Sequence, residues 1–229
     1  MSVQYGESPV STQELRDFYD QEFKKIIIKD EDRAYEWMAH KRFKNYILGK
    51  QVLDVGCGGG FFLKELKKLA NKAVGIDLSG EALRIATNSI SGSDNLAQGS
   101  AEELPFKSDS FDAVFCLGSL EHFSDIQKAL REMGRISRKE GWIFVMVPNL
   151  FWYKDIISVF KTGDVCSRNQ RYEFFASPSH WAEIVSSAGL KIKKIWKYNG
   201  ISKHSWKQAI KDLVIPKNLS YHIIFAAQP

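Results

Sequence analysis

The stretch QVLDVGCGGG occupies residues 51–60, and it joins a short apolar run to a cluster of glycines. A run of this length that stops at glycine is typical of a strand buried in a parallel sheet. We predict that residues 61–69 follow as a helix. A strand, a tight glycine turn and a helix in this order place bare backbone and a helix N-terminus above the edge of the sheet, where such folds bind ligands.

The same alternation continues to residue 148. We predict further strands at 73–77, 96–99, 111–117 and 142–147, and helices at 80–88 and 126–137. Strands that alternate with helices of about 10 to 12 residues imply right-handed βαβ units and a sheet covered on both faces. The predicted fold class is therefore α/β, doubly wound and Rossmann-like.

Helices are predicted before this core. One begins at Ser11 or Thr12, and a second runs from Asp32 to Ile47 and is ended by Gly49. The apolar side chains of the first helix are spaced to share one face: Leu15, Phe18, Tyr19 and Phe23.

The alternation stops after residue 148. We predict a helix at 179–188 and strands at 190–198 and 221–227, with the two strands forming an antiparallel hairpin on the sheet edge. Residues 149–178 fit no strand–helix unit and are rich in aromatics, so we expect an insertion that serves as a lid or a substrate wall. We expect a single domain over 1–229, with a helical cap (1–50), a cofactor-binding core (51–148), the aromatic insertion (149–178) and the last helix with the hairpin (179–229).

Composition restricts the class of protein. The length of 229 residues with 44% hydrophobic and 26% charged residues fits one globular domain. Cys57, Cys116 and Cys166 form no CxxC pair, so we expect a reducing compartment and no metal site. The N-terminus lacks the pattern of a signal peptide, and no apolar run approaches the roughly 18 to 20 residues of a membrane helix. We therefore expect a cytoplasmic protein without a membrane span.

The net charge of +5 permits a nucleic-acid partner but does not favour one. The lysines are spread over several segments, as they are on the solvated faces of ordinary helices. The sequence carries no signal for an oligomeric state.

The glycine turn favours a cationic ligand over a dinucleotide. Glycines occupy positions 56, 58 and 60, but Phe61 stands where the dinucleotide fingerprint has its third glycine. Asp54, at the end of the preceding strand, would repel a pyrophosphate and suits an amino group or a sulfonium. A nicotinamide-dependent dehydrogenase is therefore disfavoured.

A second carboxylate ends the next strand. Asp77 lies seventeen residues after Gly60, where an acidic side chain accepts hydrogen bonds from both ribose hydroxyls of an adenosine. Asp77 would alternatively cap the following helix, but Ser79 is available for that role. We therefore predict that Asp77 binds a ribose.

These residues carry a family resemblance. The stretches VLDVGCGGG (52–60), GIDLS (75–79), GSAEELPF (99–106) and FDAVFC (111–116) resemble the successive motifs of class I S-adenosylmethionine-dependent methyltransferases. LEHF (120–123) and GW (141–142) continue the match, which covers roughly residues 50 to 148. The resemblance implies a seven-stranded sheet, six strands parallel and the last antiparallel, and S-adenosylmethionine as the cofactor.

The resemblance also implies a set of cofactor-binding residues. Asp54 and the glycine turn would face the methionine part, Asp77 the ribose and Leu78 the adenine. Many relatives have Asp in place of Ser100, whose hydroxyl is a weaker acceptor, so adenine recognition would rest on Glu102 or the backbone of Ala101. The full set is Asp54, Gly56, Cys57, Gly58, Gly60, Asp77, Leu78, Ser100, Ala101, Glu102, Cys116 and Leu117.

Methyl transfer requires alignment of the acceptor and exclusion of water, and a hydroxyl acceptor must also lose its proton. His122 is the predicted general base, with Glu121 orienting it, binding an acceptor or stabilising a helix start. His180 and Trp181 are explained mainly by a helix start at Pro178. Arg171, Tyr172 and the aromatic insertion are candidates for an acceptor pocket or a satellite core.

Three functions remain open. The first is O- or N-methylation of a small molecule, similar to the quinone-ring O-methyltransferases. The second is methylation of RNA or protein, although residues 116–119 (CLGS) lack the Asn/Asp-Pro-Pro-aromatic motif of enzymes that methylate the exocyclic amines of bases. The third is a regulatory protein that binds the cofactor without turnover.

Overall fold

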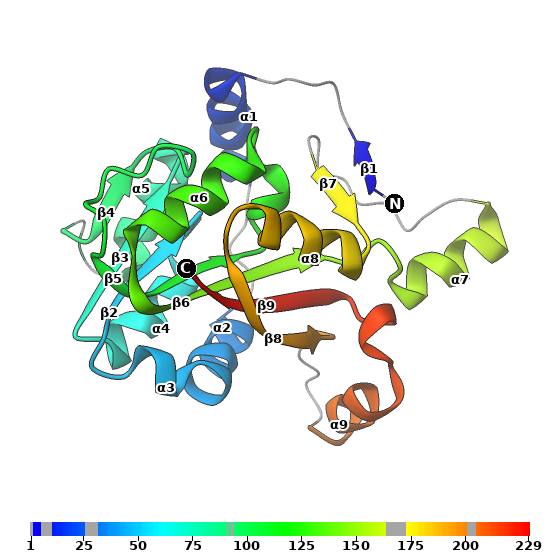
Figure 1. Cartoon of the computed structure of the whole chain (residues 1–229). Helices are drawn as coiled ribbons and strands as arrows, with labels where there is room; N and C mark the ends of the chain where they lie inside the picture. Colours follow the sequence, from blue (N-terminus) through cyan, green and yellow to red (C-terminus); the bar gives the residue numbers. More distant parts are fainter. Residues whose placement is uncertain are drawn as a thin grey trace.

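A seven-stranded mixed sheet forms the centre of the computed structural model, which describes residues 2–5, 11–25, 32–90, 92, 94–163, 173–200 and 205–229 (Figure 1). The strand order is β4-β3-β2-β5-β6-β9-β8. Strands β2 to β6 are parallel, and β9 runs antiparallel to both of its neighbours, which confirms the predicted pattern of six parallel strands and one antiparallel strand. The strands are β2 (Gln51–Val55), β3 (Lys72–Asp77), β4 (Leu96–Gln98), β5 (Phe111–Leu117), β6 (Ser137–Pro148), β8 (Lys191–Tyr198) and β9 (His222–Gln228).

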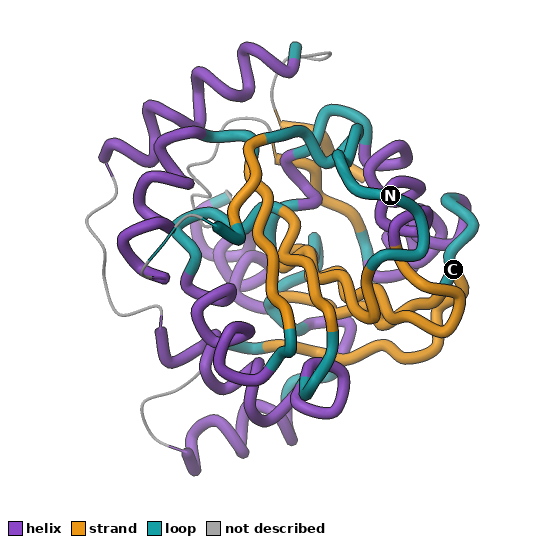
Figure 2. The backbone as a smooth tube through the Cα atoms, turned by 90° about the vertical axis from the view of Figure 1, so that its left-hand side faces the viewer, coloured by secondary structure: helices purple, strands orange, loops and turns teal. Residues whose placement is uncertain are grey.

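Helices cover both faces of this sheet, and Figure 2 shows them on either side of the strands. They are α4 (Phe61–Leu69), α5 (Gly80–Ile90), α6 (Ile126–Ile136) and α8 (Pro178–Ser187). Alternate strand residues enter two separate cores, as a period of two requires. Leu53 and Val145 pack with α6 and α8, whereas Val52 and Phe144 pack with α4 and the segment before β2.

The segment before the core departs in part from the sequence prediction. Helix α1 (Thr12–Lys25) begins as predicted, but the second helix is divided into α2 (Asp32–Trp37), the π-helix η1 (Met38–Arg42) and α3 (Lys44–Ile47). The Phe43 N–H donates to the Met38 carbonyl oxygen five residues earlier, at 2.9 Å. Residues five apart share a side of a π turn but not of an α-helix, so the π turn turns both Met38 and Phe43 into the core.

The C-terminal part contains elements that the sequence analysis missed. The 149–178 segment carries α7 (Tyr153–Thr162) and β7 (Glu173–Ala176), which pairs antiparallel with β1 (Ser2–Tyr5). The predicted hairpin is present, with β8 at the sheet edge, but α9 (Ser205–Val214) and η3 (Lys217–Leu219) lie between its strands. In the described part of the chain, no helix has the length and apolar character needed to cross a bilayer.

Gly60 at the start of α4 yields a stability prediction. Its φ is +78°, and an added Cβ would lie 2.9 Å from the Ala86 Cβ and 3.1 Å from the Ala86 Cα on α5. We expect Gly60→Ala to lower the free energy of unfolding by about 2–4 kcal/mol, because left-handed strain is added to overpacking. Guanidinium unfolding measures this loss. Gly189→Ala is the control, since Gly189 has a φ of +89° with open space around it. Equal losses in the two variants would contradict a role for the Ala86 contact.

Candidate functional site

A cavity of about 350 Å³ lies between α1 and the carboxyl ends of β2, β3 and β5. This is the edge at which doubly wound sheets bind their ligands. The lining residues from the sheet and its loops are Val55, Gly56, Gly58, Ile76, Asp77, Leu78, Gly99, Ser100, Ala101, Glu102, Gly118, Ser119, His122, Phe123 and Ser124. The predicted residues that share this cavity are therefore Gly56, Gly58, Asp77, Leu78, Ser100, Ala101, Glu102 and His122.

Helix α1 forms the other wall of the cavity. The face predicted from the sequence lines it, through Leu15, Phe18, Tyr19 and Phe23 together with Thr12 and Glu22. Asp20 fixes this helix over the end of β3, because its Oδ1 accepts from the Ser79 hydroxyl at 2.5 Å and from the Glu81 N–H at 3.2 Å. The sequence indicated which residues share a face but not that the face covers a ligand site.

The glycine turn brings bare backbone against the loop after β5. Gly56 has a φ of +70°, and an added Cβ would lie 2.6 Å from both the Cβ and the Oγ of Ser119. The Ser119 hydroxyl donates to the Gly56 carbonyl oxygen at 3.2 Å. The Ser119 side chain therefore packs directly on the bare backbone of the turn, and both contribute to the cavity wall.

Asp77 ends β3 at the cavity wall with its carboxylate held in place. Its Oδ2 accepts from the Gly58 N–H at 2.8 Å and its Oδ1 from the Ser79 N–H at 2.9 Å. Burial raises the pKa of this carboxyl even though these N–H groups act in the opposite direction. The Ser79 hydroxyl accepts from the Ala82 N–H at 3.1 Å, so Ser79 caps α5 as predicted and Asp77 is not needed for that role.

Asp54 lies beneath the turn and does not line the cavity. Its residue is 3% exposed. Burial, and then the charge of Asp77, raises the pKa of Asp54 well above its ordinary value. A positively charged ligand near the turn would reduce the repulsion between the carboxylates of Asp54 and Asp77. A role of Asp54 toward such a ligand stays a prediction.

Asp54→Asn is expected to stabilise the ligand-free protein and weaken cofactor binding. A carboxyl whose folded pKa is raised favours the folded state when protonated, so stability falls as pH rises from about 3.9 through the raised pKa. Asparagine does not titrate, so we expect its melting temperature to be roughly 2–4 °C higher at neutral pH, with the gain vanishing near about pH 4. Affinity for S-adenosylmethionine should fall about 10-fold, because the negative charge beneath the turn, which would attract the sulfonium, is lost.

Asp112 provides a control of opposite sign for this pH dependence. Burial alone would raise the Asp112 pKa, but the Gln51 N–H and Arg138 outweigh burial and lower it. Asp112→Asn should therefore lower the melting temperature at neutral pH and leave cofactor affinity unchanged. A higher melting temperature in both variants would contradict the assignment to Asp54.

Glu102, which is predicted to lie beside the adenine, already accepts hydrogen bonds from other residues of the protein. The Ser100 hydroxyl donates to Glu102 Oε2, and Glu102 Oε1 accepts from the N–H and the hydroxyl of Ser124, both at 3.0 Å. These bonds connect the loops that follow β4 and β5. The backbone of Ala101 lies in the same wall, and apolar Leu78 and Phe123 complete it.

The remaining predicted cofactor residues lie behind the cavity wall. Cys57, Gly60, Cys116 and Leu117 are not among its lining residues, and Gly118 and Ser119 occupy the place predicted for Cys116 and Leu117. Burial raises the pKa of the Cys57 and Cys116 thiols well above the usual value. Both side chains are therefore protonated packing groups, and their predicted contact with the cofactor stays a prediction.

A cluster of ionisable side chains adjoins the cavity at His122. His122 ends the 3₁₀-helix η2 (Leu120–His122) and lines the cavity, with Nε2 3.9 Å from Oε1 of buried Glu121. Glu121, His122 and Glu173 each place a potential ligand atom within 4.8 Å of the others. These groups are close enough to share a proton or a cation.

Tyr19 covers this cluster from α1. Its ring lies edge-on to the His122 imidazole, with 5.8 Å between ring centroids. Burial, followed by the charges of Glu121 and Glu173, raises the pKa of the Tyr19 phenol. The phenol is thus a neutral group facing two carboxylates. Sequence reasoning missed Glu173 and this role of Tyr19, because both reach His122 only through tertiary contacts.

The other candidates from the sequence lie elsewhere. Trp181 is fully buried and donates from Nε1 to the Pro148 carbonyl oxygen at 3.0 Å, while Ser177 accepts from the His180 N–H at 3.2 Å as the N-cap of α8. These contacts confirm a helix start. Arg171 and Tyr172 lie outside the described residues. None of the described lining residues comes from 149–178, so the lid stays a prediction.

Comparison with known proteins gives a consistent result. The family described as "Methyltransferase domain" matches residues 53–145. A ubiquinone biosynthesis O-methyltransferase of Nitrosomonas europaea is 30% identical over 167 residues, which cover 67% of this chain and 70% of that protein. The uncharacterized methyltransferase YcgJ of Bacillus subtilis is 30% identical over 161 residues, or 68% of this chain and 63% of that protein. The match thus spans less than two thirds of the length of YcgJ.

A solved structure shares the fold. The S-adenosylmethionine-dependent methyltransferase from Mesorhizobium loti superimposes with a TM-score of 0.64 at 16% identity, covering 86% of this chain and 99% of that one. At this identity the likeness concerns the fold.

Proposed function

This chain belongs to the class I S-adenosylmethionine-dependent methyltransferases, and we propose that it methylates a hydroxyl group of a small organic acceptor. One observation carries the proposal: a single cavity is lined by the glycine turn, by Asp77 and by His122. A ribose acceptor and a potential proton acceptor therefore face the same space.

The residues present fit S-adenosylmethionine. The cavity volume of about 350 Å³ lies within the usual range of roughly 300–1,000 Å³ for small-molecule sites. A side chain at Gly56 would clash with Ser119, so glycine is required where the turn packs against the loop after β5 in the cavity wall. Asp77 would hold the ribose, and Leu78 and Phe123 would contact the adenine. When bound, the cofactor supplies a methyl group already activated by the sulfonium charge.

His122 then has the task of removing the acceptor proton. Its side chain is largely buried and lines the cavity, so it can meet an acceptor hydroxyl out of contact with bulk water. The carboxylates of Glu121 and Glu173 favour the positive imidazolium that forms when the proton is taken. Helix α1, with Tyr19 over His122, excludes water from the part of the cavity around His122.

Oxygen rather than nitrogen is proposed as the methylated atom for two reasons. A hydroxyl needs a base during transfer, and the cavity provides one in His122. The Nitrosomonas europaea relative is named as an O-methyltransferase of ubiquinone biosynthesis. The proposed acceptor class is therefore an aromatic hydroxyl compound, and the proposed location is the cytoplasm.

Calorimetry and a transfer assay test this function. We expect the protein to bind S-adenosylmethionine in preference to NAD, and to move a labelled methyl group from the cofactor to phenols and catechols but not to matched anilines. Preferential NAD binding would overturn the cofactor assignment. Cofactor binding without transfer to any hydroxyl acceptor would favour a regulatory protein, and transfer to anilines alone would overturn O-methylation.

A further inference from the structure

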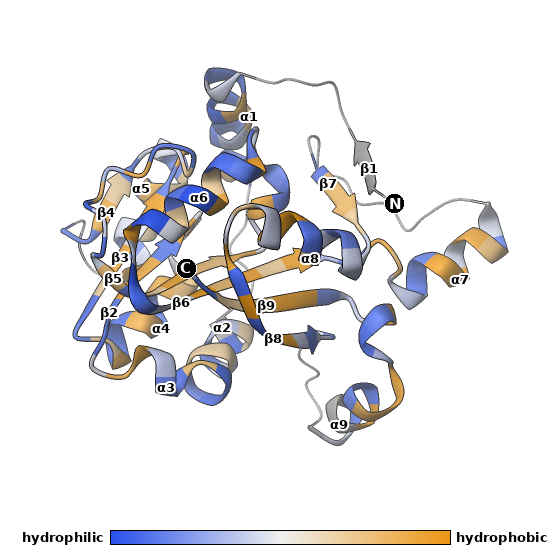
Figure 3. Ribbon diagram, viewed as in Figure 1, coloured by the Kyte–Doolittle hydropathy of each residue, from blue (hydrophilic) through white to orange (hydrophobic). Residues whose placement is uncertain are grey.

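Two helices of this protein turn their apolar faces away from the core. On α7, Phe160 is 88% exposed, whereas Asp155 is buried. On α9, Leu213 is 84% exposed and Val214 69%. Helices of globular proteins normally bury the apolar face, so this inversion requires an explanation. Figure 3 shows hydrophobic residues on both helices, which project from the body of the protein.

Both helices originate at one corner of the sheet. The ends of β6 and β8 and the start of β9 lie in one row, in which His222 is paired with both Pro148 and Tyr198. Helix α7 follows β6, and α9 connects β8 to β9. A chain of contacts joins them: Trp152 packs on Tyr221 at 4.6 Å between ring centroids, and the Tyr221 N–H donates to Asn199 Oδ1 at 3.3 Å.

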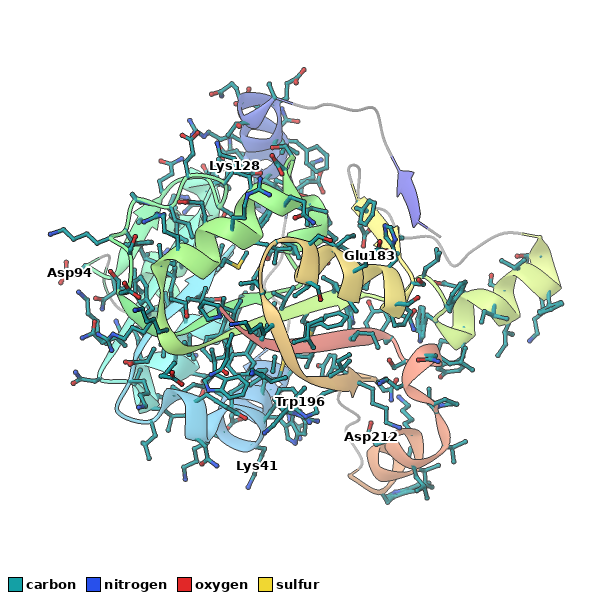
Figure 4. All side chains as sticks on the ribbon, in the orientation of Figure 1. Lys41, Asp94, Lys128, Glu183, Trp196 and Asp212 are labelled. Carbon is teal, nitrogen blue, oxygen red and sulfur yellow. The ribbon has the colours of Figure 1, made fainter. Side chains whose placement is uncertain are left out.

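The polar side of α9 is held toward the sheet. Asn199 Nδ2 donates to Asp212 Oδ1 at 3.3 Å, and Asp212 is labelled on α9 in Figure 4. Lys197 Nζ donates to the Ile215 carbonyl oxygen at the end of the helix, at 2.7 Å. Trp206 and Ile210, which are 60% and 51% exposed, lie with Leu213 on the side turned away from Asp212.

Lysines flank both apolar faces. Residues 149–163 contain Lys154 and Lys161, and residues 205–219 contain Lys207, Lys211 and Lys217. The acidic residues of the same segments are Asp155, which is buried, and Asp212, which contacts Asn199. This corner therefore carries protruding apolar side chains on helices that also carry lysines.

We propose that α7 and α9 form a docking surface for an anionic phospholipid bilayer. Short helices with Trp, Phe and Leu on one face and lysine beside it lie in the headgroup region, with the lysine stems extended toward the phosphates. A second copy of the chain fits less well, because lysine is depleted from the cores of protein interfaces. RNA would engage the lysines but leaves Phe160 and Leu213 without a partner. Helices α7 and α9 follow the carboxyl ends of β6 and β8, which belong to the same edge of the sheet as the cavity.

Vesicle flotation tests this surface on the full chain without cofactor or acceptor, so its outcome is independent of methyl transfer. We expect binding to mixed phosphatidylglycerol–phosphatidylcholine vesicles and little binding to pure phosphatidylcholine. Phe160→Ser with Leu213→Ser, and separately Lys207→Glu with Lys211→Glu, should each weaken binding about 10-fold or more. Melting temperatures of these variants should stay near that of the unmodified chain, because Phe160, Lys207 and Leu213 are exposed and Lys211 is only half-buried.

Matched controls come from the opposite edge of the sheet. Leu48 is 58% exposed there, and Lys72 and Lys139 are exposed near the starts of β3 and β6. Leu48→Ser, and Lys72→Glu with Lys139→Glu, should leave vesicle binding within about 2-fold of the unmodified chain. Equal losses in the controls would overturn the proposal, since binding would then follow total charge or hydrophobicity. Equal binding to neutral vesicles, a dimer that Phe160→Ser dissociates, or binding to RNA without binding to vesicles would also overturn it.

Discussion

Asp77→Ala is expected to weaken S-adenosylmethionine binding about 100-fold or more in calorimetry, since two charge-assisted hydrogen bonds are removed together. The Gly58 and Ser79 N–H groups hold the carboxylate at the cavity wall, and each oxygen keeps a lone pair for a ribose hydroxyl. Alanine offers neither acceptor. S-adenosylhomocysteine carries the same ribose, so its affinity should fall by the same factor, whereas Asp54→Asn should affect the charged cofactor more.

The alanine variant also loses stability, because the Gly58 and Ser79 N–H groups lose their acceptor. Asp112→Ala is the matched control for this effect. The Asp112 carboxylate likewise accepts from a backbone N–H, that of Gln51 at 2.8 Å, and it pairs with Arg138, but it lies at the opposite end of the strands. We expect a comparable drop in melting temperature and an unchanged dissociation constant for Asp112→Ala. An Asp77→Ala protein that binds the cofactor normally would remove the ribose assignment.

The core of the fold follows from patterns that are local in the sequence. The predicted bounds of β2, α4 and β5 agree with the structure because each element is a single apolar run or helical period ended by a clear breaker. The alternation of helices and strands then leaves few topologies open. The terminal strand pair is likewise placed correctly, although α9 lies within its connection.

Helices α7 and α9 and the β1–β7 pair were missed in the sequence analysis. The apolar residues of α9 resemble those of an ordinary core helix in spacing, but they face outward, which spacing alone does not reveal. The β1–β7 pair joins residues 2–5 to residues 173–176, which lie far apart in the sequence. Its four-residue strands lack a long period. The same limit applied to Glu173, since β7 brings it beside His122 from 51 residues away in the sequence.

In the candidate site, the sequence indicates where a residue lies along a strand but not which way its side chain points. The sequence correctly indicated that the glycine turn, Asp77 and His122 meet at one edge, because all three follow parallel strands. It did not distinguish a strand-end side chain that faces the cavity from one that faces the core. Asp54 and Cys116 were predicted to face the cofactor, but the structure buries both in the interior. The Ser100–Glu102 contact was equally invisible, since it depends on the loop at Ser124.

His122→Ala is expected to lower kcat/KM for a hydroxyl acceptor about 100-fold or more, with cofactor affinity unchanged, because it removes the proposed base and leaves the glycine turn and Asp77 in place. The acid limb of the pH–rate profile, which reports protonation of the base, should disappear in this variant. His122→Gln keeps much of the side-chain volume and should be equally slow. His180→Ala is the control, since His180 pairs with Glu183 on α8 and does not line the cavity.

Acceptors of different acidity distinguish a general base at His122 from a residue that only positions the acceptor. A nitro-substituted phenol that is already ionised needs no base, so His122→Ala should slow its methylation much less than that of the parent phenol. A chelator should leave the unmodified enzyme active if Glu121, His122 and Glu173 handle a proton. Loss of activity with chelator and its recovery with a divalent cation would instead assign these three side chains to a metal, because their ligand atoms are within reach of one ion. Equal slowing of both phenols by His122→Ala would mean that the imidazole positions the acceptor and accepts no proton from it.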